Sequence, residues 1–136
     1  MTFVFPLVSA TVAALLGLLA VLLAVRVITG RVRHGVNAGD GGHAALAQAI
    51  RAHSNLAEHV PLALLLLAFA ESAGYARSII LVLGALLLVA RLASAWGLSH
   101  SLAASAPRQA GAGMTLLVTV IASLLILYRA ALMTVL

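Results

Sequence analysis

The chain has 136 residues, of which 64% are hydrophobic and 8% are charged, and its mean hydropathy is +1.19. This composition excludes an ordinary soluble domain and predicts an integral membrane protein. A chain of this length has room for several spans of about 20 residues each and for no separate soluble domain, so we expect residues 1–136 to form one membrane domain.

All eight basic residues are arginine, and against three acidic residues they give a net charge of +5. The arginines are scattered among hydrophobic segments instead of being clustered on one solvated face, so nucleic acid is not an expected partner. Cysteine is absent, which excludes disulfides, thiolate metal ligands and a cysteine nucleophile. The histidines show no metal-ligand spacing, and no metal site is predicted.

Hydrophobic runs predict four transmembrane helices, at about 3–28, 44–70, 78–96 and 108–133. Together they would form an all-α bundle with both termini on the same side of the membrane. In the first helix, small residues recur at spacings of three and four, which lets another helix approach closely: Ala13, Gly17, Ala20 and Ala24. In the second helix, Pro61 removes one backbone hydrogen bond and is expected to bend the helix.

The segments between the predicted helices indicate how the chain is oriented. The glycine-rich segment 30–43 predicts an exposed loop, with a turn at Asp40 next to the following helix. Trp96 and Tyr128 lie near span ends, where aromatic residues serve as interface anchors. By the positive-inside rule, the first and third loops are cytoplasmic and both termini are outside, because most arginines lie near those two loops: Arg26, Arg31, Arg33, Arg51 and Arg108.

A polar stripe occupies the first half of the second predicted helix. At 100° per residue, one sector of about 100° contains five polar side chains, whereas His53 lies well away from it: Gln48, Arg51, Asn55, Glu58 and His59. Ionisable groups in a membrane helix are costly unless they meet partners or a ligand, so this stripe is the first place to look for function.

Partners for these charges must be found on other elements. Arg51 and Glu58 are about 10.5 Å apart along the helix axis, a separation at which we expect no direct pairing. Arg91, in the third helix, lies at a depth similar to that of Glu58, so a contact between them, within or between subunits, is the simplest structural explanation of both charges. Ser94 shares the face of Arg91. The excess of guanidinium groups over acids suits a small ligand that carries carboxylates and one amine.

The pattern Arg51-x-His53-x-Asn55-x-x-Glu58-x-x-Pro61 resembles that of the MAPEG family, the membrane-associated proteins in eicosanoid and glutathione metabolism. The likeness includes residues 28–33, 39–42, 91–92 and Gly97, and the short loops resemble those of the bacterial branch. It implies a homotrimer of four-helix subunits, in a bacterial inner membrane. It also implies glutathione as co-substrate, bound between subunits at the cytoplasmic side, and a lipophilic second substrate arriving from the bilayer.

The resemblance assigns ligand-binding roles to particular residues. Arg51, Asn55 and Glu58 match the glutathione-binding positions of the family on the second helix. The third helix adds two further candidates to the predicted glutathione site, Arg91 and Ser94.

The same resemblance implies two catalytic candidates. Arg108 corresponds, after a shift of one residue, to the arginine that lies near the glutathione sulfur in active members, and Arg33 is the second candidate. Active members usually carry tyrosine near the end of the third helix, and this chain departs from that pattern with Ser94, Trp96 and Leu98.

Two classes of function follow from these observations. The first is a glutathione-dependent transferase or peroxidase that acts on a lipophilic electrophile. The second is a non-catalytic membrane protein whose arginines bind lipid head groups or lock subunits together. Asn55 and Glu58 beside Arg51 favour the first class, because an anionic head group requires only cations. A transporter is disfavoured, since no pair of interrupted helices or chain of acidic residues marks a path.

Overall fold

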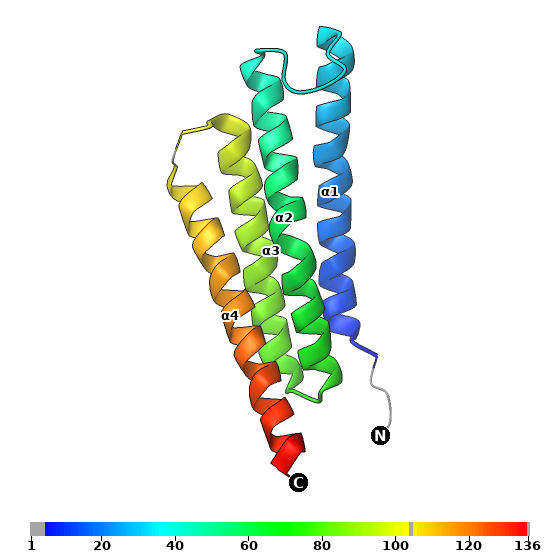
Figure 1. Cartoon of the computed structure of the whole chain (residues 1–136), viewed down its shortest axis with the longest axis vertical. Coiled ribbons are helices and arrows are strands. Elements are labelled where there is room, and N and C mark those ends of the chain that lie inside the picture. The colour runs from blue at the N-terminus through cyan, green and yellow to red at the C-terminus, as the bar shows by residue number, and fades with distance from the viewer. Residues whose placement is uncertain (1–4, 104, 136) are drawn as a thin grey trace.

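The computed structural model describes residues 5–103 and 105–135, and these fold into four antiparallel helices. The helices are α1 (Leu7–His34), α2 (Ala44–Ser72), α3 (Arg77–His100) and α4 (Ala106–Val135). The start of α1 and the end of α4 lie at one end of the bundle, and the α1–α2 and α3–α4 loops lie at the other (Figure 1). The predicted all-α bundle of four helices is confirmed.

The surface of the bundle matches a lipid environment. Three helices, α1, α3 and α4, are long and apolar enough to cross a membrane. α2 is not among them, because several polar residues lie among the apolar ones in its first half. Large leucines are exposed on the outer faces of α1 and α4, as expected where the surrounding solvent is hydrocarbon: Leu18, Leu22, Leu116 and Leu127.

α2 and α3 form the centre of the bundle, because each contacts the other three helices, whereas the described residues of α1 and α4 make no contact with each other. The core between them is apolar and closely packed, and its largest buried side chains include Leu16, Leu67, Leu87 and Val118. α2 runs through Pro61 as one helix. The polar residues of α2 that lie level with α3 can therefore reach side chains of α3.

α1 continues well past residue 28, where we predicted its end, so Arg31 and Arg33 lie on its last turns and not in a loop. Gly30 does not stop the helix, because it packs against Leu46, whose Cδ1 would lie 3.0 Å from an added Cβ. The helix stops at Gly35, which adopts a left-handed φ of 65° and donates its N–H to the carbonyls of Arg31 and Val32.

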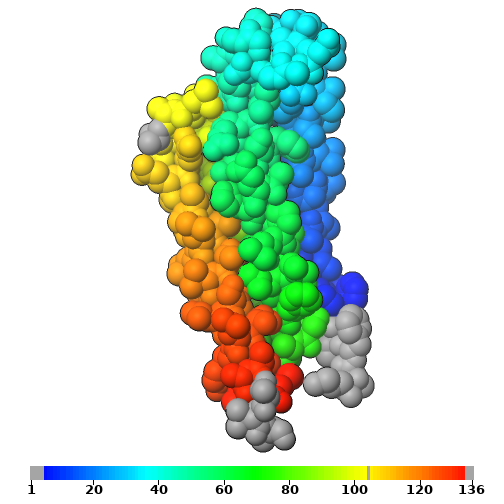
Figure 2. Space-filling view, in the orientation of Figure 1, coloured from blue at the N-terminus to red at the C-terminus, as the bar shows by residue number. Residues whose placement is uncertain are grey.

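The other helix ends follow the predictions more closely. α3 extends from the predicted end at 96 to His100, and α4 begins at Ala106, directly after Ser105. The turn predicted at Asp40 is present, since its Oδ1 accepts a hydrogen bond from the Gly42 N–H at 3.0 Å. The space-filling view shows that the paired ends of α1 and α2 project beyond the α3–α4 loop (Figure 2).

The opposite end of the bundle is fastened by Glu71, near the end of α2. Its carboxylate accepts hydrogen bonds from the Val8 N–H (2.9 Å), the Ser9 N–H (2.8 Å) and the Ser9 hydroxyl (2.7 Å). These N–H groups belong to the first turn of α1 and have no partner within the helix. Glu71 thus serves as the cap of α1, supplied by a different helix.

Candidate functional site

Arg91 is the most deeply buried charged side chain of the described residues, with 1% of its surface exposed. Its guanidinium donates to Asn55 Oδ1 (3.2 Å) on α2, to Ser94 Oγ (3.2 Å) on α3 and to the Gly111 carbonyl oxygen (2.9 Å) on α4. We call these four residues the Arg91 cluster. It joins three helices at one point inside the bundle.

Close packing of α3 against α4 makes this cluster possible. A Cβ added to Gly111 would collide with Ser94 Oγ and with the Ala90 carbonyl oxygen. Only glycine therefore lets the backbone of α4 come near enough for its carbonyl to accept a hydrogen bond from Arg91. The same carbonyl also accepts a hydrogen bond from the Thr115 hydroxyl at 2.9 Å. Sequence reasoning missed Gly111, although a glycine inside a membrane helix is a signal that the backbone of another helix can approach there.

Arg51 and Glu58 pair with each other on the outer face of α2. Arg51 Nη1 lies 3.8 Å from Glu58 Oε1, and about half of each side chain is exposed, 51% and 52%. The expectation that these two residues would not pair is wrong, because their long side chains extend toward one another along the helix. The pair is loose, since a charge-assisted hydrogen bond measures about 2.7–2.9 Å.

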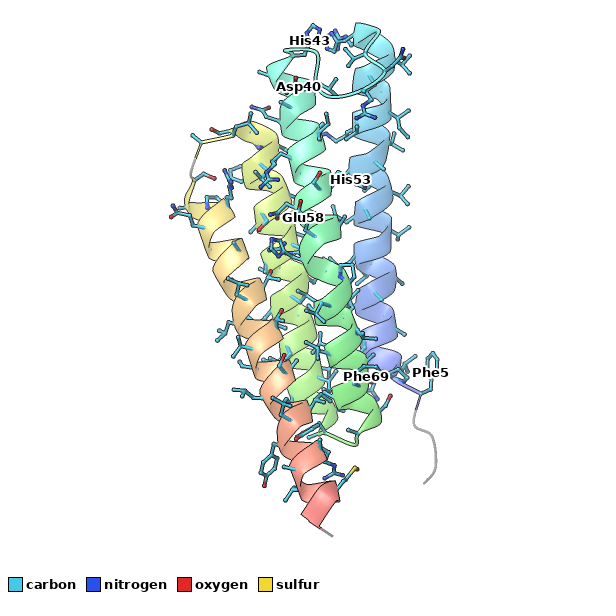
Figure 3. The ribbon with its side chains drawn as sticks, viewed as in Figure 1. Phe5, Asp40, His43, His53, Glu58 and Phe69 are labelled. Atoms are coloured by element: carbon cyan, nitrogen blue, oxygen red, sulfur yellow. The ribbon has the colours of Figure 1, made fainter. Side chains whose placement is uncertain are left out.

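The expected contact between Arg91 and Glu58 is not formed in the single chain. Glu58 pairs with Arg51. Arg91 donates hydrogen bonds to Asn55 on α2, to Ser94 on α3 and to the Gly111 carbonyl on α4. Within the described residues, Arg91 therefore has polar partners but no carboxylate partner. Its Nε–H is also buried without a hydrogen bond. Figure 3 shows Glu58 on the middle stretch of α2, with His53 above it toward the α1–α2 loop.

The two catalytic candidates lie away from these contacts. Arg108, on the first turn of α4, donates from Nη1 to the Leu102 carbonyl oxygen at 2.8 Å and so holds the α3–α4 connection. Gly97 of α3 lets the start of α4 approach, since a Cβ added to Gly97 would lie 3.1 Å from the backbone nitrogen of Arg108. Arg33 is exposed on the last turn of α1 and lines a groove between α1 and α2.

The structure thus divides the predicted site residues into three groups. Asn55, Arg91 and Ser94 are in direct contact inside the bundle, and Arg51 pairs with Glu58 on its surface. The guanidinium groups of Arg33 and Arg108 belong to neither contact. Within the described ranges, the His, Asp and Glu side chains form no group of three that could hold a metal ion.

Four antiparallel helices with an apolar exterior and buried polar contacts between helices define this chain as an integral membrane protein of the four-helix class. The model of the MAPEG family matches residues 9–128, nearly the whole chain. The chain belongs to the MAPEG family, as its helix-two pattern predicted. It is also 36% identical to the inner membrane protein YecN of Escherichia coli K12 over 96 residues, which is 71% of this chain and 73% of YecN. YecN of E. coli O6:H1 matches to the same extent.

Proposed function

We propose that this protein is a membrane-bound, glutathione-dependent transferase or peroxidase that acts on a lipophilic electrophile. The observation that carries the proposal is the loose ion pair of Arg51 and Glu58, which is half exposed on α2 beside the buried Arg91 cluster. A cation, an anion and an amide on one helix face match the charges of glutathione, which has two carboxylates and one ammonium group.

The separation within the ion pair supports ligand binding. At 3.8 Å, Arg51 and Glu58 gain little from each other in a partly exposed position. A glutathione carboxylate can take two parallel hydrogen bonds from the Arg51 guanidinium, and the ligand ammonium can replace Arg51 beside Glu58. Arg51 and Glu58 would then each have a closer charged partner in the ligand than they have in one another.

The exposure of this pair supports a shared site. A charged pair on a membrane helix is costly if lipid covers it, and a neighbouring subunit would remove that cost. We therefore place glutathione between subunits of a homotrimer, at the end of the bundle that carries the α1–α2 and α3–α4 loops. The arginines near those loops favour a cytoplasmic location for that end, with both termini outside. A bacterial inner membrane fits the described location of YecN.

Arg108 is the candidate for activating the glutathione thiol. A guanidinium close to the sulfur lowers the thiol pKa and raises the fraction of thiolate at neutral pH. The thiolate then attacks the electrophilic carbon, the leaving group departs with its electron pair, and the thiol proton passes to solvent. One Arg108 nitrogen already donates to Leu102, and the guanidinium has further N–H groups for the sulfur. Arg33 is the second candidate.

This activity can be tested with detergent-purified protein by measuring the conjugation of glutathione to an aryl halide through the change in absorbance. We expect turnover by the wild type, and in Arg108→Ala we expect kcat to fall by about 100-fold with a smaller change in KM. Arg129→Ala is the matched control, because it removes an exposed arginine at the other end of α4. Equal turnover in Arg108→Ala and in the control would rule out this role for Arg108.

A non-catalytic role in subunit packing or lipid binding is the second candidate function. It is favoured by the hydrogen bond between Arg91 and Asn55, because these two side chains already pair with each other without a ligand. On this alternative, the wild type would neither conjugate the aryl halide nor bind glutathione. The same assay therefore separates the two candidates.

A further inference from the structure

A groove between α1 and α3 combines one cation with an apolar floor. It has a volume of about 390 Å³ and lies on a different part of the surface from the Arg51–Glu58 pair. Leu19 and Leu22 of α1 and Leu92 of α3 line its apolar part, and Arg26, Trp96 and Ser99 line its polar end. We call it the α1–α3 groove.

Arg26 is fixed at the polar end of this groove by α3. Its Nη1 donates to Ser99 Oγ at 2.6 Å, and the Ser99 hydroxyl donates in turn to the Ala95 carbonyl oxygen at 2.7 Å. Arg26 remains exposed, and the described part of the chain records no contact between it and a carboxylate. A guanidinium has five N–H donors, so this hydrogen bond leaves donors available for an anion.

The surroundings of Arg26 are typical of the boundary between hydrocarbon and water. Ser99, its partner, is next to the end of α3 at His100, and beyond this level α1 and α2 project as a free pair (Figure 2). Below it, the groove is lined by leucines. Trp96 is 59% exposed and its ring lies against that of His100, with centroids 4.6 Å apart. Exposed tryptophan is typical of the interfacial layer where lipid head groups lie.

We propose that the α1–α3 groove binds an anionic phospholipid, with its phosphate on Arg26 and one acyl chain along the leucines of α1 and α3. A guanidinium forms paired hydrogen bonds with a phosphate, and the apolar floor below it matches a hydrocarbon chain. The lack of an acidic residue in the groove lining favours a lipid with net negative charge over a zwitterionic one. This lipid site includes neither Arg51 nor Glu58, although Arg26 also lines the neighbouring α1–α2 groove that contains Arg33.

The single tryptophan of the chain reports directly on this groove. The full-length protein is reconstituted into phosphatidylcholine vesicles that contain equal mole fractions of brominated phosphatidylglycerol or brominated phosphatidylcholine. Bromine on the acyl chains quenches Trp96 when the lipid occupies the groove. For the wild type we expect a relative binding constant about fivefold in favour of the anionic lipid, the effect of one arginine at a membrane surface.

Two variants and a control make the test specific. Arg26→Gln should reduce the preference to about one, and Arg26→Lys, which keeps the charge, should retain most of it. Arg77→Gln is the matched control, because Arg77 is also exposed beside α1 but lies about 28 Å from Trp96 along α3. Its preference should equal that of the wild type.

Three results would overturn the proposal. Equal quenching of the wild type by both lipids would show that the groove does not select an anionic head group. An unchanged preference in Arg26→Gln would show that another group selects the lipid. A lack of quenching by either lipid would show that a second copy of the chain covers this face.

Discussion

Arg91 shows how far a sequence can predict the environment of a single residue. Its position in a hydrophobic run indicated that it must find polar partners, and the helical period correctly placed Ser94 on its face. The period did not reveal Gly111, because the partner is a backbone carbonyl on another helix. The pairing of Arg51 with Glu58 was also not predictable from sequence spacing, because it depends on how two long side chains extend along the helix.

Replacing Arg91 by alanine should strongly destabilise the bundle. The substitution removes three hydrogen bonds, leaves the Gly111 carbonyl without this donor, and opens a cavity between α2, α3 and α4. We expect the free energy of unfolding, measured by denaturant titration in mixed micelles, to fall by about 2–4 kcal/mol. The exposed control Arg129→Ala should change it by less than about 0.5 kcal/mol. If the two variants were equally stable, the Arg91 cluster would not hold the helices together.

The helices themselves were largely predictable, because runs of apolar residues of this length have few alternatives in a membrane protein. The prediction failed at the end of α1, where Gly30 suggested a loop but the helix continues to His34. A glycine ends a helix when its backbone turns left-handed, as at Gly35, and not when it packs against a neighbouring helix, as Gly30 does against Leu46. Sequence spacing cannot distinguish these two uses of glycine.

The crossing of α3 and α4 can be tested with two glycines on one helix. In Gly111→Ala, the added methyl group would collide with Ser94 and with the backbone of Ala90, so we expect a loss of about 1–3 kcal/mol in stability. Gly113→Ala is the control, because nothing lies within 4 Å of its added Cβ. That control should be neutral or slightly more stable, since alanine favours helix over glycine by about 0.5–1 kcal/mol. Equal melting temperatures for both variants would contradict the described packing of α3 against α4.

The whole bundle is fastened at two levels by polar contacts between helices. Near the termini, Glu71 binds the first turn of α1, and further along, the Arg91 cluster joins α2, α3 and α4. The second of these contacts was predictable only in part, and the first was not predicted at all, because the second helix was expected to end at residue 70, one residue before Glu71. At the level of the Arg91 cluster, the Arg51–Glu58 pair is left half exposed on the outer face of α2, and this exposure is what suggests a site completed by another subunit.

The central claim is tested most directly by isothermal titration calorimetry, in which glutathione is titrated into the detergent-purified protein. We predict a binding heat for the wild type and a loss of affinity of at least about tenfold in both Arg51→Ala and Glu58→Ala, because each removes one charge that the ligand needs. Asp40→Ala, which removes an exposed acid from the α1–α2 loop, should bind as the wild type does. No heat with the wild type, or equal affinity in all three variants, would contradict a glutathione site on this face of α2.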